Sequence, residues 1–302
     1  MTIVTSPPAA RLPLLVRLPL YLVLVVGVVM GTVLLLFRPG VSQLQQIPIT
    51  VVVLAAVVAV TYVFRRYVDR RSWLLLGVTT PSRMRWWELG AGFVIGSVAV
   101  AAVLVAQLAV GVEVAFVGTS AASVGTGSAL LTLVAGAVLV ALKAAVEEVA
   151  FRGYLVANLA TRLSWPVAAV IGGVIFTLAH LPGGVSGPWF FGEAIVEYTA
   201  WGCLLTWAWR STGSLWAPTG IHAGWNWAQD YLLGTGAWAL PDFGHSLLHL
   251  RAAGPTWLIG GPGNMDGSAM VVVQMAVIAA GVALLGRRAV GRGRMGDTGA
   301  QS

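Results

Sequence analysis

Three ionisable side chains lie within six residues near the middle of the chain, at Glu147, Glu148 and Arg152. The sequence on both sides of them is apolar over long distances. A charged side chain at mid-bilayer depth costs about 2.5–3.5 kcal/mol on insertion scales, so such a cluster indicates a functional site whose partners must be found. The segments 176–180, which ends in His180, and 222–226, which begins with His222, supply candidates.

The spacing of the cluster predicts two different roles for its two glutamates. Glu148 and Arg152 lie at i, i+4 on one predicted helix, in the orientation that favours an ion pair and neutralises both charges inside a bundle. Glu147 lies about 100° away around the same helix and therefore faces elsewhere. Lys143, one turn before Glu147, is an alternative partner, so a purely structural interpretation of Glu147 also stays open.

A helical hairpin brings Glu147 and His180 to the same level. Residues 161–165 form a polar turn, and Pro166 is suited to the first turn of the next helix. Glu147 precedes this turn, and His180 follows it, by similar numbers of residues, so each lies about 21–22 Å from it at 1.5 Å per residue. His222 lies only about 14 Å from the turn at Gly213 that precedes its helix. It reaches the level of Glu147 and His180 only if the 161–165 turn extends further out of the bundle than the turn at Gly213.

His222 and Asn226 lie at i, i+4 and share one face of a later helix, which adds an imidazole and an amide to the set. With no serine or cysteine in a position to pair with these groups, covalent catalysis is disfavoured. A carboxylate that takes a proton from water oriented by an imidazole is a general-base device. A second imidazole and an amide can donate hydrogen bonds to a developing oxyanion. The combination predicts hydrolysis of an acyl bond.

Two alternatives use the same polar residues. Glu147, His180 and His222 could hold Zn²⁺, which would activate the water instead. Asn226 is a poor zinc ligand, and this favours the version without metal. In the other alternative, the polar core of a membrane scaffold or carrier binds a ligand and performs no chemistry.

The composition identifies an integral membrane protein. Of the 302 residues, 58% are hydrophobic and 10% are charged, whereas about a quarter of an average soluble domain is charged. The net charge of +7 comes mainly from arginines near predicted helix ends. It therefore reflects the orientation of the chain in the membrane and does not indicate nucleic-acid binding. The single cysteine, Cys203, excludes an internal disulfide and a Cys-based metal cluster, and we expect it to be a small buried apolar side chain.

Apolar runs of sufficient length predict an all-α polytopic bundle of about eight spans. The expected spans are 14–36, 47–64, 88–111, 128–148 with helix continuing to 162, 166–180, 190–209, 214–233 and 268–286. The first, although preceded by basic residues, is too long for a signal peptide and lacks a convincing cleavage site, so we expect it to be retained.

The distribution of arginines predicts the orientation. With the N-terminus inside, nearly all arginines of the short connecting segments fall on the cytoplasmic side, and only Arg38 and Arg251 fall outside. Both termini are therefore expected in the cytoplasm. Residues 65–87, with six arginines and a Trp pair, are expected at headgroup level on the inner surface. The tail after Arg294 is expected to be disordered.

The predicted outer loop, residues 234–267, contains Asp242, His245 and His249. Two histidines four positions apart would suit a metal ion if the segment were helical. Adjacent Gly and Pro residues, and the lack of an acidic residue on the same face, favour an ordinary loop.

Three motifs occur in a fixed order along the chain: Glu-Glu-x-x-x-Arg at 147–152, Phe-x-x-x-His at 176–180 and His-x-x-x-Asn at 222–226. In this order the chain resembles the CAAX prenyl protease and bacteriocin-processing (CPBP or Abi) family of intramembrane endopeptidases. The resemblance covers about residues 128–233. It divides the chain into an N-terminal region (1–127), a catalytic core (128–233), and a last region with the outer loop, final span and tail (234–302).

The resemblance implies an eight-helix fold and a glutamate-dependent endopeptidase. By motif position, Glu147 would act as base with His180, while His222 and Asn226 would stabilise the oxyanion. The implied partners are a membrane-associated protein or peptide substrate and the lipid bilayer. Neither a cofactor nor nucleic acid is implied, and zinc is kept as the minority alternative. Eukaryotic relatives cut prenylated CAAX proteins, but nothing in this sequence selects a prenyl group.

Overall fold

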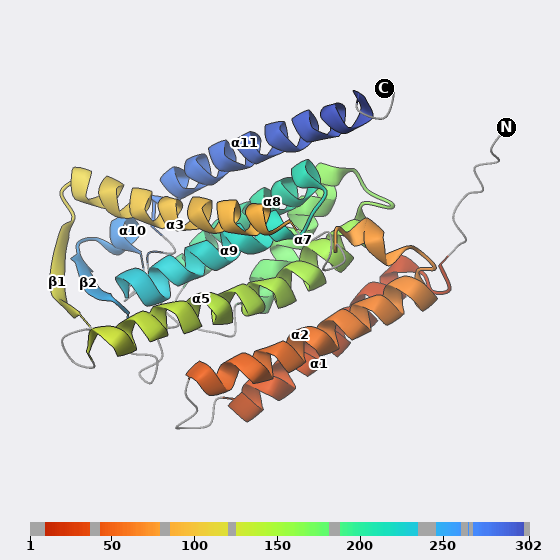
Figure 1. The fold of residues 1–302 in the computed structure, drawn as a ribbon, viewed down its shortest axis with the longest axis horizontal. Helices are drawn as coiled ribbons and strands as arrows, with labels where there is room; N and C mark the ends of the chain where they lie inside the picture. Colours follow the sequence, from red (N-terminus) through yellow and green to blue (C-terminus); the bar gives the residue numbers. More distant parts are fainter. Residues whose placement is uncertain are drawn as a thin grey trace.

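The computed structural model describes residues 10–36, 43–78, 85–119, 125–180, 188–234, 246–260, 265 and 268–298. In this part of the chain, long helices form one bundle, and a small two-stranded sheet lies at one end of it (Figure 1). The predicted all-α polytopic class is confirmed. Of the three residues considered for a metal site in the outer loop, Asp242 and His245 lie outside the described residues.

The first two helices form an antiparallel hairpin at one edge of the bundle. They are α1 (Leu14–Leu36) and α2 (Gln43–Val63), and α2 continues as the π-helical segment η1 (Phe64–Val68). Figure 1 shows the hairpin in red and orange beside α5 (Thr126–Glu148), and the short 3-10 helix η2 (Trp73–Leu76) then leads the chain toward α3 (Trp86–Ala109).

The helix with the acidic cluster is continuous and contains a π-helical part. Helix α5 passes directly into η4 (Val149–Val156) and then α6 (Ala157–Leu159), and all eight residues of η4 are buried. Because π-helical turns form poorly on their own and are frequent at functional sites, the surrounding structure must hold this segment in place. The remaining helices are α7 (Trp165–His180), α8 (Pro188–Thr212), α9 (Trp216–Trp227), the π-helical η6 (Ala228–Leu233), α10 (Thr256–Ile259) and α11 (Val271–Thr298).

Helices α3 and α9 cross in close contact through glycines. A Cβ atom on Gly92 or Gly96 of α3 would meet the backbone of α9, and one on Gly220 or Gly224 of α9 would meet the backbone of α3. Such small residues let two helix backbones approach closely in a membrane. The two α9 glycines flank His222 on either side, so this crossing fixes the part of α9 that carries the histidine.

The sheet was not predicted from the sequence. Strand β1 (Glu113–Thr119) follows α3 and pairs antiparallel with β2 (Leu248–Ala253), with an irregularity between Phe116 and Gly118. The second strand occupies part of the expected outer loop and contains His249, whose Nδ1 lies 3.3 Å from the Ser246 hydroxyl.

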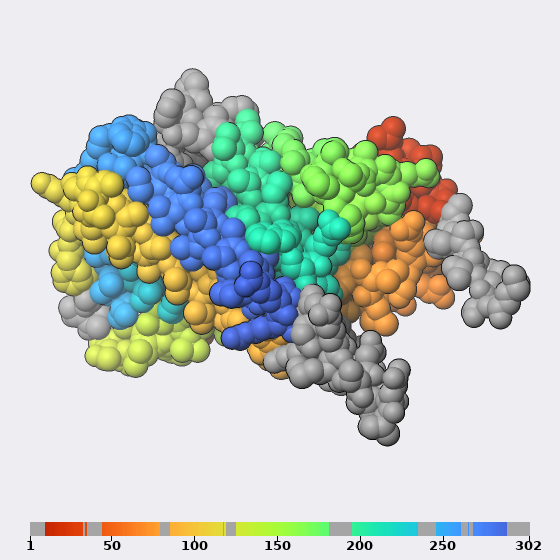
Figure 2. All heavy atoms as spheres, turned by 90° about the horizontal axis from the view of Figure 1, so that it is seen from above, coloured from red at the N-terminus to blue at the C-terminus, as the bar shows by residue number. Residues whose placement is uncertain are grey.

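Every expected span contains a helix, but not every helix has the length of a span. Five helical segments are long and apolar enough to cross a membrane: 14–32, 44–68, 86–109, 126–159 and 271–288; the apolar helix 165–180 is shorter. The expected number of eight therefore stays a prediction. Figure 2 shows α11 lying along the outside of the bundle between α3 and α8.

One expectation about the end of a helix was wrong. The tail was expected to lose its structure after Arg294, but α11 continues to Thr298. Arg65 is buried with Arg17 around the carboxylate of Asp69, and its place at headgroup level stays a prediction.

Candidate active site

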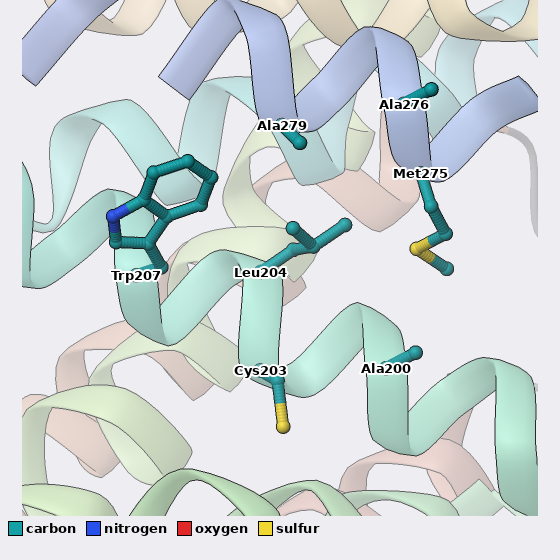
Figure 3. Close-up of a pocket in the computed structure, with 7 residues that line it drawn as sticks. All are labelled: Ala200, Cys203, Leu204, Trp207, Met275, Ala276 and Ala279. Atoms are coloured by element: carbon teal, nitrogen blue, oxygen red, sulfur yellow. The ribbon is translucent and has the colours of Figure 1, made fainter. Parts of the chain in front are cut away.

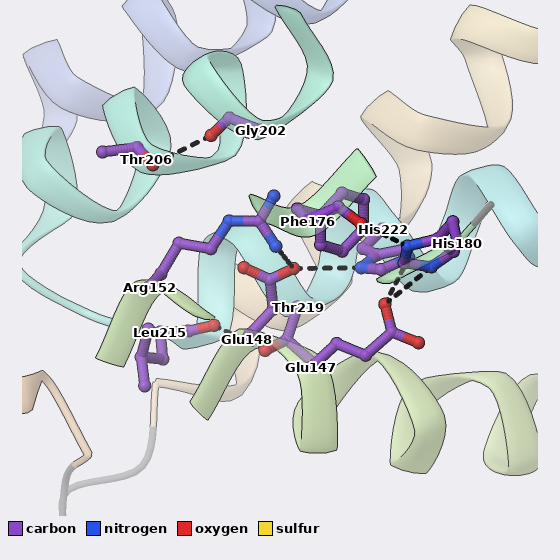
Figure 4. A network of polar contacts seen from close by, with 10 residues as sticks. All are labelled: Glu147, Glu148, Arg152, Phe176, His180, Gly202, Thr206, Leu215, Thr219 and His222. Atoms are coloured by element: carbon purple, nitrogen blue, oxygen red, sulfur yellow. Dashed lines mark hydrogen bonds and ion pairs between the residues drawn. The ribbon is translucent and has the colours of Figure 1, made fainter. Parts of the chain in front are cut away.

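Glu148 and Arg152 form the ion pair that their spacing predicts. Arg152 Nη1 donates to Glu148 Oε1 over 2.8 Å, and the exposed fractions of the two side chains are 1% and 0%. The guanidinium also lies 4.7 Å above the ring centre of Phe176 on α7 (Figure 4). The pair is thus enclosed on one side by the helix that carries His180.

His222 joins this pair from α9. Its Nδ1 lies 2.9 Å from Glu148 Oε1, the same oxygen that accepts from Arg152. A carboxylate only accepts hydrogen bonds, so Nδ1 carries a hydrogen and donates a hydrogen bond to Glu148. This contact turns the Nε2 atom of His222 away from Glu148 and toward Glu147.

Glu147 lies between the two histidines. Its Oε2 is 3.7 Å from His180 Nε2 and 3.7 Å from His222 Nε2, both too long for a hydrogen bond. The same oxygen is buried and has no hydrogen-bond partner among the described residues, although 30% of the side chain is exposed. Three polar atoms therefore face one small space without contacting each other.

The orientation of His180 is set by its own helix. Its Nδ1 lies 2.7 Å from the backbone oxygen of Phe176, one turn earlier. A carbonyl accepts, so Nδ1 is the donor and, in the neutral ring, Nε2 presents a lone pair toward Glu147. A lone pair and a carboxylate oxygen that face each other need a bridging proton or water between them.

Aromatic side chains surround the histidines. Phe176 lies 4.2 Å from the His180 ring and 6.1 Å from the His222 ring, measured between ring centres. From α8, Tyr198 lies 5.7 Å from His180, and Trp201 lies 6.2 Å from His222. The sequence analysis missed these two α8 residues, because nothing in an apolar helix distinguishes an aromatic residue that lines a site from one that faces lipid.

The structure brings together five of the six predicted site residues. Asn226 lies one turn after His222 on α9, on the expected face, and is partly exposed. Lys143, the alternative partner of Glu147, has both Asp230 and Glu147 among its charged neighbours. The structural interpretation of Glu147 as the partner of Lys143 therefore stays open.

The described residues contain no group of three His, Cys, Asp or Glu side chains placed to hold a metal ion. In the set proposed for zinc, Glu147 Oε2 lies 3.7 Å from the Nε2 atoms of both His180 and His222. Zinc at this position would require their side chains to move closer to one point, because ligand atoms lie about 2.0–2.2 Å from the ion.

An apolar groove of about 620 Å³ lies between α8 and α11, away from the predicted site residues (Figure 3). Cys203 lines this groove and is partly buried, whereas the sequence predicted a buried side chain. The other lining residues are Ala200, Leu204, Trp207, Met275, Ala276 and Ala279.

Residues 126–228 match the family model described as type II CAAX prenyl endopeptidase Rce1-like. The match contains all six predicted site residues and confirms the recognition of the CAAX protease family for this third of the chain. Searches of curated proteins and of solved structures found no match. A match to a protease family and five long apolar helices together support a multi-pass membrane protein of the hydrolase class.

Proposed function

We propose that the protein is an intramembrane endopeptidase in which Glu147 activates water to hydrolyse a peptide bond of a membrane-associated protein or peptide. The observation that carries this proposal is the position of Glu147 Oε2, which is buried, lacks a hydrogen bond among the described residues and faces two imidazole nitrogens at 3.7 Å. The match of residues 126–228 to a protease family model supports the reaction class.

A water molecule can bridge two of the three atoms that face this space, Glu147 Oε2 and His180 Nε2. Two atoms 3.7 Å apart can both lie about 2.8 Å from a water oxygen placed to one side of the line between them. The water then donates one hydrogen to Glu147 and the other to the Nε2 lone pair of His180. Its own lone pair is left directed into the site, where a scissile carbonyl carbon would lie.

The reaction needs only groups present in the chain. The water oxygen attacks the carbonyl carbon while Glu147 takes the proton, and the carbonyl oxygen becomes the oxyanion of a tetrahedral intermediate. The bond from carbon to nitrogen then breaks, and the proton held by Glu147 passes to the leaving amine. The products are a carboxylic acid and an amine, so protons and electrons balance without a co-reactant.

His222 and Asn226 are the proposed oxyanion donors. Because Nδ1 of His222 already donates to Glu148, an Nε2 proton requires the ring to be an imidazolium during that step. The carboxylate of Glu148 accepts from Nδ1 over 2.9 Å and holds the ring with Nε2 directed into the site, in the way that an acidic residue orients a catalytic histidine. Glu148 and Arg152 would thus act through His222 and not on the substrate.

The test is proteolysis by purified protein in liposomes that contain a mixture of lipid-anchored peptides, with prenylated and unprenylated CAAX peptides as separate arms. Cleavage in ¹⁸O-water is followed by mass spectrometry, because water attack places one ¹⁸O atom in the new carboxylate. Glu147→Gln should lower the rate by about 10² or more while folding and peptide binding persist. Glu113→Gln, which removes an exposed carboxylate from β1, is the control and should cleave like the parent.

Cleavage by Glu147→Gln at the parent rate would contradict the proposed role of Glu147. Peptide binding without any cleavage by the parent would favour the alternative of a membrane binding protein or carrier. The prenylated and unprenylated arms decide the substrate class independently of the mechanism.

A further inference from the structure

A second buried polar cluster lies outside the site, around the carboxylate of Asp69 at the end of η1. Its partners come from four elements. Arg17 Nη1 of α1 forms an ion pair with Asp69 at 3.0 Å. The hydrogen-bond donors are Arg65 Nη1 of η1 at 3.5 Å, the Tyr154 hydroxyl of η4 at 3.2 Å and Asn158 Nδ2 of α6 at 3.1 Å. All five side chains are buried, and Asp69 is fully so. Burial of a carboxylate is tolerated only when it is well paired, so this arrangement is tightly specified.

The cluster holds the π-helical segment of the catalytic helix. Asp69 Oδ1 accepts from Tyr154, inside η4, and Oδ2 accepts from Asn158, one turn later. Asn158 Nδ2 also donates to the backbone oxygen of Tyr154 over 3.0 Å. One carboxylate therefore connects the N-terminal hairpin to the last turn of η4 and to α6.

The ring of Tyr154 is enclosed by the same hairpin. It stacks on Tyr21 of α1 with ring centres 3.9 Å apart, and Phe64 of η1 meets it edge-on at 5.9 Å. Tyr154 is fully buried. The hydroxyl is the part of this side chain that contacts Asp69, so the hydrogen bond can be removed without removing the ring.

The held segment begins directly after Glu147 and Glu148. Glu148 precedes the first residue of η4, and Arg152 lies within it, two residues before Tyr154. Arg152 and His222 share Glu148 Oε1. A rotation of η4 would therefore move Arg152 against Glu148 and change the contact that orients His222.

We propose that Asp69 is a positioning residue, which holds η4 through Tyr154 and Asn158 and thereby sets the Arg152–Glu148–His222 geometry. The kinetic part of this inference rests on the proposed proteolytic function. The geometric part does not, because it concerns the contact between Glu148 and His222 whatever the site does. Asp69 lies outside the segment that matches the family model, so the N-terminal hairpin takes part in organising the site.

Asp69→Asn is an unsuitable test, because it leaves two buried arginines without their counter-charge. Tyr154→Phe removes one hydrogen bond to Asp69 and keeps the ring contacts. Tyr21→Phe is the matched control: it also removes a buried hydroxyl, which bonds Thr61 at 2.8 Å, and it does not touch Asp69. Both variants lose one oxygen atom in the same region of the protein.

Two readouts on the full-length protein in lipid nanodiscs test the proposal. The first is the ¹⁵N resonance of His222 Nδ1 at one fixed pH, with the resonance of His249 as an internal reference. The second is peptide cleavage. Tyr154→Phe should shift the His222 resonance and lower kcat by about 10-fold with KM unchanged, because small displacements of catalytic groups act on the chemical step. Tyr21→Phe should leave the resonance in place and kcat within about 2-fold of the parent.

An unshifted His222 resonance in Tyr154→Phe would overturn the proposal, and so would equal effects of Tyr154→Phe and Tyr21→Phe. A shifted resonance with unchanged kcat would also overturn the positioning role. If the parent cleaves no peptide, the proposed function fails, and the His222 resonance alone then decides whether Asp69 positions Glu148.

Discussion

Removal of Arg152 should destabilise the protein strongly, because its partner cannot escape to water. The two side chains are 1% and 0% exposed and 2.8 Å apart. Breaking a buried pair by removing one partner costs about 3–5 kcal/mol. In Arg152→Ala, His222 still donates to Glu148 Oε1 at 2.9 Å, which favours the lower end. We expect a loss of about 3 kcal/mol in the free energy of unfolding.

Arg85 provides a matched control for this substitution. It pairs with Glu88 at the same distance of 2.8 Å, and Glu88 is fully buried, but 44% of the Arg85 side chain is exposed. Water can replace the guanidinium there, so Arg85→Ala should cost about 1 kcal/mol. Equilibrium unfolding in mixed detergent micelles measures both values. An Arg152→Ala variant as stable as the parent, or less affected than Arg85→Ala, would refute the buried-pair reasoning.

The double variant Glu148→Gln/Arg152→Leu separates stability from activity. Replacement of both partners of a buried pair is often nearly neutral for stability, so the double variant should recover most of the loss seen in Arg152→Ala. It should be inactive, since the carboxylate that accepts from Nδ1 and orients the His222 ring is gone.

Three further predictions concern the rest of the site and the fold. Asn226→Ala should lower kcat by about 10²–10³ with little change in KM, because an oxyanion donor acts on charge that forms in the transition state. Steady-state cleavage kinetics measure both constants, and a changed KM with constant kcat would contradict the prediction. Gly96→Ala should lower the yield of folded protein, because its Cβ would meet the α9 backbone. Gly90→Ala, with open space around it, is the control and should be tolerated. Equal yields of the two variants in size-exclusion chromatography would contradict the close crossing of α3 and α9. In a chain without its native cysteine, Arg251→Cys should react with an impermeant thiol reagent on intact cells and Arg66→Cys only after permeabilisation; the reverse pattern would invert the proposed orientation.

The sequence predicted the site better than it predicted the fold around it. Helix periodicity is regular, so counting 1.5 Å per residue from the 161–165 turn correctly brought Glu147 and His180 together. The i, i+4 spacing likewise predicted the contact of Glu148 with Arg152. Helix spacing could not predict that His222 would donate to Glu148, because that contact depends on how α9 packs against α5.

The features that the sequence analysis missed all depend on packing between distant elements. The π-helical form of η4 depends on tertiary support, which leaves no local signal. The β1–β2 pair joins segments more than a hundred residues apart. Arg17 and Arg65 were interpreted as topology markers from their places at helix ends, and only the spacing of Arg65 and Asp69, at i, i+4, gave a hint of their burial.

The zinc content of active protein tests the central claim most directly. Purified protein that cleaves peptide is analysed for metal, and turnover is measured before and after treatment with a chelator. If Glu147 itself activates the water, turnover persists in protein with far less than one zinc per chain and is unchanged by the chelator. About one tightly bound zinc per chain, whose removal abolishes cleavage and whose return restores it, would contradict the glutamate mechanism.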